Sequence, residues 1–486
     1  MDTKKLRQKI LDLAIHGKLV PQDPNDEPAS ILLERIRAEK ERLIKEGKIK
    51  QSKKTAKSSD TRHYENVPFE VPEGWEWCQV SDIFELNPKN DVPDDTQSGF
   101  IPMACVDDGF GYAHSFETRL WGEIRKGYSH FQNGDIGIAK ISPCFENRKS
   151  TIFHDLPNGI GAGTTELTVL RGCCVNTEFY LYLFQSEWYI FEGTKEFKGV
   201  VGQQRVNKEI FTTLLIPLPP IEEQNRIVTK IKKWFSLIDT LETAKEDLQT
   251  SITQVKSKIL NLAIHGKLVP QDPNDEPAIE LLKRINPKFT PCDNGQYPYD
   301  VPENWKWCKL TDLCSFLSRG KSPTYSDERI YPVFAQKCNL FGGDISLEQA
   351  RFLDPNTLSK WPEEYKLRDG DVLVNSTGTG TVGRTRLFHS DVLGNFPFVV
   401  PDSHVSVVRT LDQIDSNYIY SIMSSRYGQE YIEDNLAGST NQKELYIGVL
   451  ENMLIPLPPD KEQKHIVAKI EELFAVLDEI QKSIEA

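Results

Sequence analysis

Two sets of polar and basic side chains in this sequence are of the types that hydrogen-bond to the edges of nucleic-acid bases. Arg and Lys can engage guanine, and Asn and Gln pair with adenine. The set in the first half of the chain comprises Lys140, Arg148, Lys149, Lys198, Gln203, Gln204 and Arg205. The set in the second half comprises Arg319, Lys321, Lys337, Ser376, Thr379, Arg384, Asn441, Gln442 and Lys443. Each residue alone is more typical of an ordinary surface, but together they make both halves candidates for DNA contact.

Several residues of each set lie in a loop. In both halves this loop follows a Gly-Asp turn and a short predicted strand. These segments run over 134–149 in the first half and over 370–384 in the second. The triplets Gln-Gln-Arg and Asn-Gln-Lys, which end at Arg205 and Lys443, stand at equivalent places in the two halves. The two halves therefore carry comparable candidate residues.

The motifs that could indicate catalysis do not hold up in their local context. Gly378–Gly383 fits the G-x-G-x-x-G pattern, but the residues after it read as a strand, whereas a dinucleotide site needs a helix there. The segment 286–289, Asn-Pro-Lys-Phe, resembles the Asn-Pro-Pro-Phe motif of amino methyltransferases but lacks its second proline and a preceding cofactor-binding βαβ unit. No phosphate-binding G-x-x-x-x-G-K-[ST] loop and no duplicated catalytic or metal-ligand grouping is present. We expect a non-catalytic chain without a cofactor or metal of its own.

Internal repetition indicates how these residues are positioned. Residues 9–29 return at 258–278 with a single change, Asp12 to Asn261. Leu-Ile-Pro-Leu-Pro-Pro occurs before 221 and again before 460, and Val-Pro-Glu-x-Trp-x-Trp-Cys ends at Cys78 and at Cys308. Repeats of this kind predict that the chain contains the same structural unit twice. The blocks between them differ, so we expect the repeated parts to meet the same neighbour twice and the divergent blocks to meet different ones.

In each half, the sequence predicts a helix directly after Leu-Ile-Pro-Leu-Pro-Pro. Apolar residues after it recur at steps of four and three, typical of a coiled-coil seam. In the central helix the seam comprises Ile227, Ile231, Trp234, Ile238, Leu241, Leu248, Ile252, Val255, Ile259 and Leu262. In the C-terminal helix it comprises Ile466, Ile470, Leu473, Leu477, Ile480 and Ile484.

A seam of Thr3, Leu6, Ile10 and Leu13 continues the register of the C-terminal helix, so we expect the two chain ends to meet and to close a circular, pseudo-twofold arrangement. The alternative is a local amphipathic helix at 3–13. Gly17 and Gly266 are expected to end the helices that precede them. The repeated turn is a candidate docking site for a partner present twice, and its residues are His16, Gly17, Lys18, Gln22, His265, Gly266, Lys267 and Gln271.

The predicted fold class is α+β, with two mixed, β-rich domains joined by two long antiparallel coiled-coil helices and with circularly permuted repeats. The β-rich domains are expected to contain helices at 178–191 and 416–432. The predicted boundaries are an N-terminal helical segment at 1–44, a mobile basic linker at 45–62, a first domain at 63–219, a central coiled-coil region and turn at 220–285, a second domain at 286–458 and a C-terminal helix at 459–486. The linker could instead contact a phosphate backbone.

Composition limits the functions that are compatible with the chain. Its 486 residues suit two or three domains, and no apolar run approaches the roughly 20 residues needed to span a membrane. Nine cysteines without a Cys-x-x-Cys pair favour a reduced, cytoplasmic protein without structural zinc. The net charge of −13 argues against a chain that binds nucleic acid alone. Any DNA contact must therefore rest on local basic loops or on charge supplied by a partner.

Together these features resemble the specificity subunit of type I restriction–modification enzymes. The resemblance rests on the repeated Lys-Ile-Leu-x-Leu-Ala-Ile-His-Gly-Lys-Leu-Val-Pro-Gln, the paired Leu-Ile-Pro-Leu-Pro-Pro, the segment 139–147 and the Gly-Asp turns, and it covers nearly the whole chain. It implies two target recognition domains that each read half of a split double-stranded DNA sequence, with helices that set the gap. It also implies partners: two modification subunits that bind S-adenosylmethionine and methylate adenine, and two restriction subunits with motor and nuclease activity. ATP and Mg²⁺ would likewise belong to partner subunits.

Two other classes of function stay open from the sequence. One is a standalone methyltransferase built on segment 286–289, which S-adenosylmethionine binding to the isolated chain would reveal. The other is a coiled-coil assembly protein without a nucleic-acid role, which loss of all sequence preference in the full complex would favour.

Overall fold

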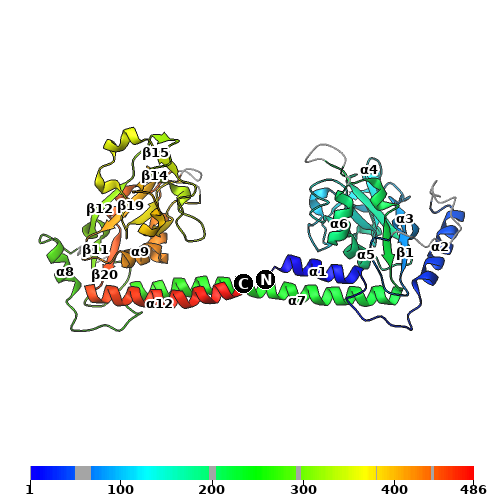
Figure 1. Ribbon diagram of the computed structural model, residues 1–486, viewed down its shortest axis with the longest axis horizontal. Coiled ribbons are helices and arrows are strands. Elements are labelled where there is room, and N and C mark those ends of the chain that lie inside the picture. Colours follow the sequence, from blue (N-terminus) through cyan, green and yellow to red (C-terminus); the bar gives the residue numbers. More distant parts are fainter. Residues whose placement is uncertain are drawn as a thin grey trace. The chain divides into compact units, whose positions relative to one another are not determined.

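The computed structural model describes residues 2–49, 67–195, 197, 204–291, 297–378, 380–438 and 443–485. The chain divides into two compact units, residues 1–244 and 245–486, and each is described by itself. The helix α7 (Ile221–Ile264) contributes its first part to unit 1 and its second part to unit 2. Figure 1 shows the elements of both units.

Unit 1 contains a domain with two four-stranded sheets and one separate pair of strands. The first sheet has the order β2 (Phe84–Leu86), β9 (Leu167–Gly172), β6 (Ile136–Ala139), β7 (Ser150–Ile152), all antiparallel. The second has the order β4 (Glu117–Leu120), β3 (Gln97–Ile101), β8 (Ile160–Gly163), β5 (Ser129–Gln132), with β3 and β8 parallel. The separate pair is β1 (Glu76–Gln79) with β10 (Leu215–Leu218). The helices are α1 (Thr3–Ile15), α2 (Ala29–Lys45), α3 (Val80–Ile83), α4 (Trp121–Ile124), α5 (Thr177–Phe184) and α6 (Glu187–Thr194).

Unit 2 repeats this plan. Its first sheet is β12 (Cys314–Arg319), β19 (Val405–Thr410), β16 (Val372–Asn375), β17 (Thr385–Leu387). Its second is β13 (Tyr325–Ser326), β15 (Arg351–Leu353), β14 (Pro332–Phe334), β18 (Val400–Pro401), with β14 and β18 parallel. The pair β11 (Lys306–Lys309) and β20 (Leu454–Leu457) matches β1 and β10. The helices are α8 (Ala278–Ile285), α9 (Ser416–Ser424), α10 (Arg426–Asp434), α11 (Ile447–Glu451) and α12 (Asp460–Glu485).

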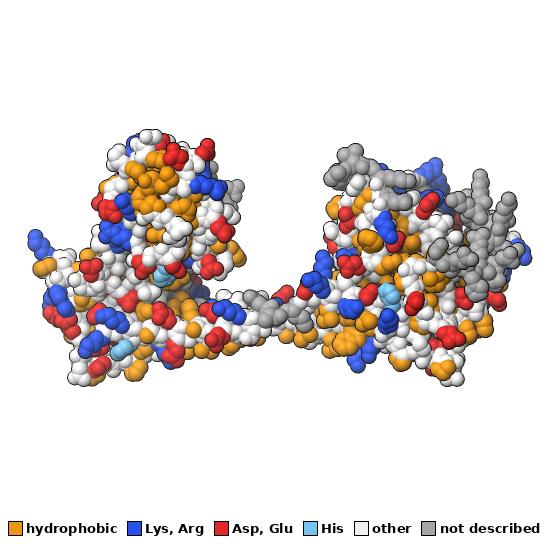
Figure 2. All heavy atoms as spheres, viewed as in Figure 1, with side chains coloured by type: hydrophobic (Ala, Val, Ile, Leu, Met, Phe, Trp, Pro, Cys, Tyr) orange, Lys and Arg blue, Asp and Glu red, His pale blue; other side chains and the backbone are white. Residues whose placement is uncertain are grey.

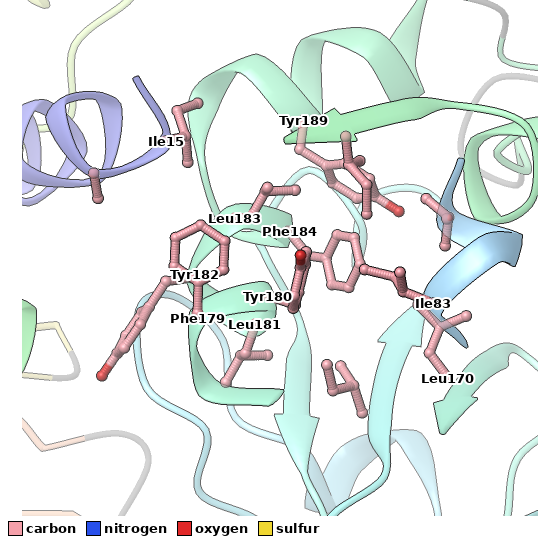
Figure 3. Close-up of a cluster of buried hydrophobic side chains, with 14 of the residues drawn as sticks. Ile15, Ile83, Leu170, Phe179, Tyr180, Leu181, Tyr182, Leu183, Phe184 and Tyr189 are labelled. Carbon is pink, nitrogen blue, oxygen red and sulfur yellow. The ribbon is translucent and has the colours of Figure 1, made fainter. Parts of the chain in front are cut away.

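The core of unit 1 gathers around α5. All residues from Phe179 to Phe184 are buried, so this helix is apolar on every side, as expected for an element inside a core. Figure 3 shows these side chains between Ile15 of α1, Ile83 of α3 and Leu170 of β9. The strands that carry the polar loops are therefore fixed to the same core as the helices of the unit.

The long helices pack as antiparallel pairs inside each unit. In unit 1, Arg7 of α1 bonds to Asp239 (2.5 Å) and Glu242 (2.8 Å) in the first part of α7, whereas Asp26, beyond the end of α1, pairs with Arg226 nearer the start of α7. In unit 2, Lys256 in the second part of α7 bonds to Asp478 of α12 at 2.5 Å, at the place that corresponds to Arg7 and Asp239. In each unit, a helix that follows Leu-Ile-Pro-Leu-Pro-Pro therefore packs against a helix that ends in the repeated Ala-Ile-His-Gly segment. The predicted meeting of the chain ends involves two different units and stays a prediction.

The predicted coiled-coil seam is wrong in part. Trp234, Leu241, Leu248, Val255 and Ile480 are each more than 40% exposed. In unit 1 the buried side of α7 keeps Ile227, Ile231 and Ile238 of the predicted seam and adds Val228 and Phe235. The physical reason is that α7 packs against the domain as well as against α1, because Phe235 meets the Tyr182 ring of α5. A helix with two neighbours buries a wider stripe than a two-stranded coiled coil does.

Two predicted helices of the β-rich domains are also wrong in their extent. The stretch 178–191 contains the separate helices α5 and α6, and the stretch 416–432 contains α9 and α10. The second helix of each pair begins at a serine N-cap, since Ser186 accepts from Tyr189 N (3.3 Å) and Ser425 from Gly428 N (3.2 Å). A hydroxyl that caps a new helix N-terminus explains both breaks.

The near-identical repeats meet one another inside each unit. Gly17 has φ +65°, and a Cβ there would lie 2.3 Å from Pro72 of the repeated Val-Pro-Glu segment. Gly266 has φ +64° and stands in the same relation to Pro302. Nearby, the Trp75 indole donates to Glu223 of α7 (2.8 Å), and the Trp305 indole donates to Glu462 of α12 (2.9 Å). We call this junction of the repeated turn, the tryptophan and the helix start the collar. Because the repeated segments contact one another in each unit, their packing accounts for their near-identity in the two halves.

Burial raises the pKa of both collar carboxylates. Desolvation is the largest cause for Glu223 and for Glu462, and the hydrogen bond from Trp75 or Trp305 opposes it. The cysteines of the same repeats, Cys78 and Cys308, are buried with their Sγ atoms near the carbonyl oxygens of Ile216 and Ile455. Their burial in both units indicates that these repeated cysteines are packing residues.

Candidate nucleic-acid interface

Each unit presents one polar loop between two strands of its first sheet. The loop runs over 140–149 between β6 and β7, and over 376–384 between β16 and β17. In unit 1 it is bound to a distant segment through Ser142 N to Gln204 O (2.8 Å) and Val206 N to Lys140 O (2.9 Å). In unit 2, Leu445 N donates to Ser376 O (2.8 Å). These bonds place Gln204 beside the loop of unit 1, and the segment that follows Lys443 beside the loop of unit 2.

The Gly-Asp turns hold the loop-bearing strands in place through buried ion pairs. Asp135 accepts two hydrogen bonds from Arg171 (2.9 and 2.8 Å), and Asp371 accepts two from Arg409 (both 2.7 Å). Burial raises the pKa of Asp135 and of Asp371, and the arginine opposes that rise in both cases. Bidentate pairing fixes the direction of both partners, so the start of β6 and of β16 is rigid.

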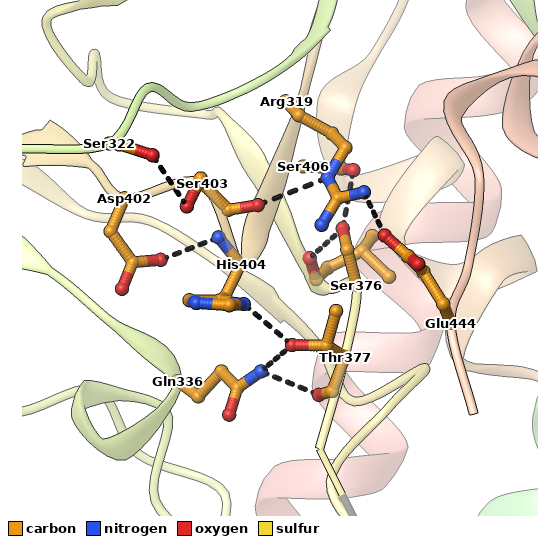
Figure 4. Close-up of polar contacts among 11 residues, drawn as sticks. Arg319, Ser322, Gln336, Ser376, Thr377, Asp402, Ser403, His404, Ser406 and Glu444 are labelled. Atoms are coloured by element: carbon orange, nitrogen blue, oxygen red, sulfur yellow. Dashed lines mark hydrogen bonds and ion pairs between the residues drawn. The ribbon is translucent and has the colours of Figure 1, made fainter. Parts of the chain in front are cut away.

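The loop of unit 2 lies in a connected polar network (Figure 4). Thr377 shares its hydroxyl with His404 Nδ1 (2.8 Å) and accepts from Gln336 at its carbonyl oxygen (2.6 Å). Arg319 binds Glu444 (2.5 Å) and the carbonyl oxygen of Ser403 (3.1 Å). His404 is exposed, and Thr377 and Gln336 are half-buried. The network therefore presents amide, hydroxyl and imidazole groups in fixed directions, which is what direct reading of base edges requires.

The sequence prediction missed three members of this group. Gln336, Thr377 and His404 come from three separate segments, and Figure 4 shows them converging on the loop. Gln336 stands beside the predicted Lys337, and Thr377 belongs to the predicted loop, so both could have been included. Nothing in the sequence around His404 distinguishes it.

The predicted DNA-binding residues of unit 2 divide into surface and internal groups. Lys337 is exposed, Lys443 lies 4.0 Å from Glu433, and Arg384 donates to Asn339 O at 2.7 Å. The prediction for Ser376 is corrected, because this residue is fully buried and its hydroxyl is shared with Ser406 at 2.6 Å.

Two further residues of unit 2 are already engaged within the chain. Arg319 is held by Glu444, as described above, and Lys321 donates to Lys360 O (3.1 Å) while lying 3.9 Å from the centre of the Tyr365 ring. Thr379, Asn441 and Gln442 lie outside the described residues.

In unit 1 two predicted residues are engaged within the chain. Arg148 is half-buried, donates to Gln185 O (3.1 Å) and lies over the Phe110 ring, and burial lowers its pKa. Lys149 is largely covered and lies 3.5 Å from Asp108. Both side chains brace the loop from within. Lys140 and Gln204 are half-buried, and the exposed Arg205 forms a two-bond pair with Glu166. Lys198 and Gln203 lie outside the described residues.

The proposed partner-docking residues also fall into two groups. His16 and His265 bond to the carbonyl oxygens of Asp12 and Asn261 and lie against the rings of Phe69 and Tyr299. With Gly17 and Gly266 they belong to the collar. The exposed members are Lys18, Gln22, Lys267 and Gln271, and docking at these positions stays a prediction.

The surface charge agrees with local rather than broad DNA contacts. On the face drawn in Figure 2, basic and acidic side chains are interspersed over both units.

No group of three or more His, Cys, Asp or Glu suited to a metal ion occurs among the described residues. In the same residues no helix is long and apolar enough to cross a membrane. The Gly378–Gly383 motif is followed by strand β17, as the sequence predicted.

Comparison with known proteins gives consistent matches over the whole chain. The family model of the type I restriction modification DNA specificity domain matches residues 72–250 and again 302–486. The EcoEI specificity subunit of Escherichia coli is 36% identical, with 99% of this chain and 91% of that protein covered. The EcoAI specificity subunit of Escherichia coli is 35% identical, with 98% and 90% covered.

Solved structures support the same fold. A chain from a study of complex assembly and conformational transition in the type I R-M system has a TM-score of 0.57 at 19% identity, covering 86% of this chain and 94% of its own length. The HsdS subunit from Thermoanaerobacter tengcongensis has a TM-score of 0.50 at 20% identity, with 85% and 93% covered.

Proposed function

The chain belongs to the type I restriction–modification DNA specificity family, and we propose that each of its two domains reads one half of a split double-stranded DNA sequence. Within this family it is a DNA-recognition subunit of a restriction–modification complex and not an enzyme itself. The observation that carries the proposal is the pair of equivalent loops, 140–149 and 376–384, held in the same way on two domains of different sequence. Equivalent placement suits a common task, and different side chains suit different base sequences.

The helices are proposed to set the distance between the two half-sites. Two antiparallel helix pairs, braced by Arg7 with Asp239 and by Lys256 with Asp478, are stiff elements compared with a loop. A stiff connection fixes separation and rotational phase on a duplex, in which a turn takes about 10–10.5 base pairs over about 34–36 Å.

The remaining partners follow from this role. We propose two modification subunits that bind S-adenosylmethionine and two restriction subunits that use ATP and Mg²⁺, all acting with this chain in the cytoplasm. These subunits would bring the cofactors, and their basic surfaces would offset the net charge of −13 when the complex encloses DNA. Lys18, Gln22, Lys267 and Gln271 are the proposed docking positions because they are exposed at both collars.

A binding assay with the assembled modification complex tests the proposal. Duplexes carry both half-sites with the spacer lengthened or shortened by one to three base pairs. We expect at least about a 10-fold loss of affinity per base pair of change, because each moves one half-site by about 3.4 Å and rotates it by about 35°. A complex that binds all spacers equally well would contradict a fixed separation. Binding without any sequence preference would contradict the reading function.

A further inference from the structure

Phe341 is an aromatic side chain that the fold of unit 2 leaves in solvent. It lies at the tip of the loop 340–344, between the bridged residues Asn339 and Ile345, and is 90% exposed. The other large apolar side chains that are exposed in the described part of the chain are at most 59% exposed. Exposing a whole Phe ring is unfavourable, so this position calls for an explanation.

Unit 1 has a corresponding loop whose aromatic tip is turned inward. This loop runs over 107–113 between the bridged residues Val106 and His114, and its tip residue is Phe110. Phe110 packs on Phe235 of α7 with ring centres 6.0 Å apart, and Gln185 Nε2 bonds to Gly111 O at 2.8 Å. The loop of unit 2 is shorter. Among the described residues, no ring packs on Phe341. The aromatic side chain at the tip of this loop is therefore packed in unit 1 and exposed in unit 2.

The exposed tip is firmly held. Leu340 N donates to Asp344 O (3.0 Å), and Arg386 donates to Leu340 O (3.2 Å). Arg384 donates to Asn339 O (2.7 Å), and its guanidinium lies 5.5 Å from the centre of the Phe341 ring. The two ends of the loop that presents the ring are therefore held in place.

The surroundings of Phe341 carry positive charge. Arg384 and Arg386 flank the tip, and Lys337 is exposed on the adjoining 3-10 helix η6 (Gln336–Cys338). In the part of the chain that the structure describes, none of these three forms an ion pair, but the charge of Asp344 in the same loop acts on Arg386 and compensates it in part. The same segment bonds to the loop 376–384 and to the strand before it, because Gln336 donates to Thr377 O and Asn339 donates to Asn375 Oδ1. An apolar ring beside Arg384 and Lys337, next to groups that can bind base edges, is complementary to a step of stacked bases between phosphates.

We propose that Phe341 inserts between adjacent base pairs in the half-site that unit 2 reads, and that unit 1 makes no such insertion. This inference rests on the proposed function and adds to it a local distortion of one half-site. Apolar side chains that enter a base step unstack it and kink the duplex, so sequences whose steps unstack easily are favoured. Phe341 would thus contribute sequence preference without a hydrogen bond to any base, and Arg384 would contact the neighbouring phosphate.

The test uses the assembled modification complex and duplexes that carry 2-aminopurine at successive positions of each half-site. Fluorescence of this base analogue rises when its stacking is lost. We expect a rise at one step of the half-site read by unit 2 and none in the other half-site. F341A should abolish that rise and weaken binding roughly 5- to 150-fold, the range expected for one base–aromatic stack. F341W should retain both.

Phe191 of α6 provides a control in unit 1, where no insertion is proposed, since it is 59% exposed and lies under the ammonium of Lys195. F191A should change neither fluorescence nor affinity. Unchanged fluorescence and affinity in F341A would overturn the inference. Loss of complex assembly in F341A, with normal DNA distortion in the complexes that form, would also overturn it and assign Phe341 to a protein interface. A wild-type complex without sequence preference would instead overturn the proposed function.

Discussion

Replacing Arg409 with methionine is expected to lower the free energy of unfolding of unit 2 by about 3–5 kcal/mol, the usual cost of removing one partner from a buried ion pair. Asp371 is 0% exposed and receives both of its charged hydrogen bonds from Arg409. Without that arginine, the carboxyl of Asp371 keeps its desolvation and loses the group that opposes it. The effect is measured by unfolding the chain in denaturant and monitoring amide hydrogen exchange in β16 and β19.

The loss in R409M is expected to depend on pH with a definite sign. Burial raises the pKa of Asp371 above 3.8, and Arg409 is the main group that lowers it again. In R409M the folded-state pKa is therefore higher still, so the folded state favours the protonated acid. Stability is then retained at low pH and lost as the pH rises through the folded-state pKa. A destabilisation that is equal at pH 4.5 and at pH 8 would contradict this account.

Two variants serve as controls for R409M. R171M removes the equivalent arginine of unit 1, where Asp135 is also buried, and should affect exchange in β6 and β9 instead. The double variant D371L/R409M removes both charges and should recover much of the lost stability, because buried pairs are often replaced by apolar residues at little cost. A double variant as unstable as R409M would show that packing, and not the uncompensated carboxyl, causes the loss.

Exchanging residues 76–218 for the corresponding domain of another specificity subunit is expected to change one half of the recognised DNA sequence and to leave the other half intact. Strands β1 and β10, which bound this block, pair with each other, so the exchange cuts at one place in the fold. Since each mismatched base pair costs about 1–3 kcal/mol, a half-site of three base pairs should differ by at least about 100-fold in affinity between the parent and the exchanged chain.

The readout of the exchange is the preferred sequence of the assembled complex in a pool of random duplexes. The reciprocal exchange of residues 306–457, between β11 and β20, should change only the other half. An exchange that alters both halves would contradict independent reading by the two domains. An exchange that alters neither would place sequence recognition outside these domains.

The sequence was sufficient to predict the duplicated plan, because repeats such as 9–29 and 258–278 are almost identical. It also predicted the helix ends at Gly17 and Gly266 and the strands that follow the Gly-Asp turns. Their signals are local, since they rest on backbone conformation and turn chemistry. The widening of the buried stripe on α7 to include Phe235 was not predictable, because it depends on Tyr182 of α5, which is distant in the sequence.

The candidate site shows the same limit. A basic residue in a loop has the same sequence signal whether it faces solvent or braces the fold, so the sequence could not separate Lys337 from Arg148 and Lys149. His404 and Gln336 reach the loop of unit 2 only through the order of the sheets. Phe341 and Phe110 differ in exposure because one loop is shorter and because only Phe110 meets Phe235. That difference needs the packed structure.

The most direct measurement of the central claim is a map of methylated adenines across the genome of a host that expresses this chain with its modification subunit. Two reading domains held at a set separation should yield one motif made of two specific blocks with an unspecified gap of a single length. Methylation at a continuous motif, or at two blocks with a variable gap, would contradict the account.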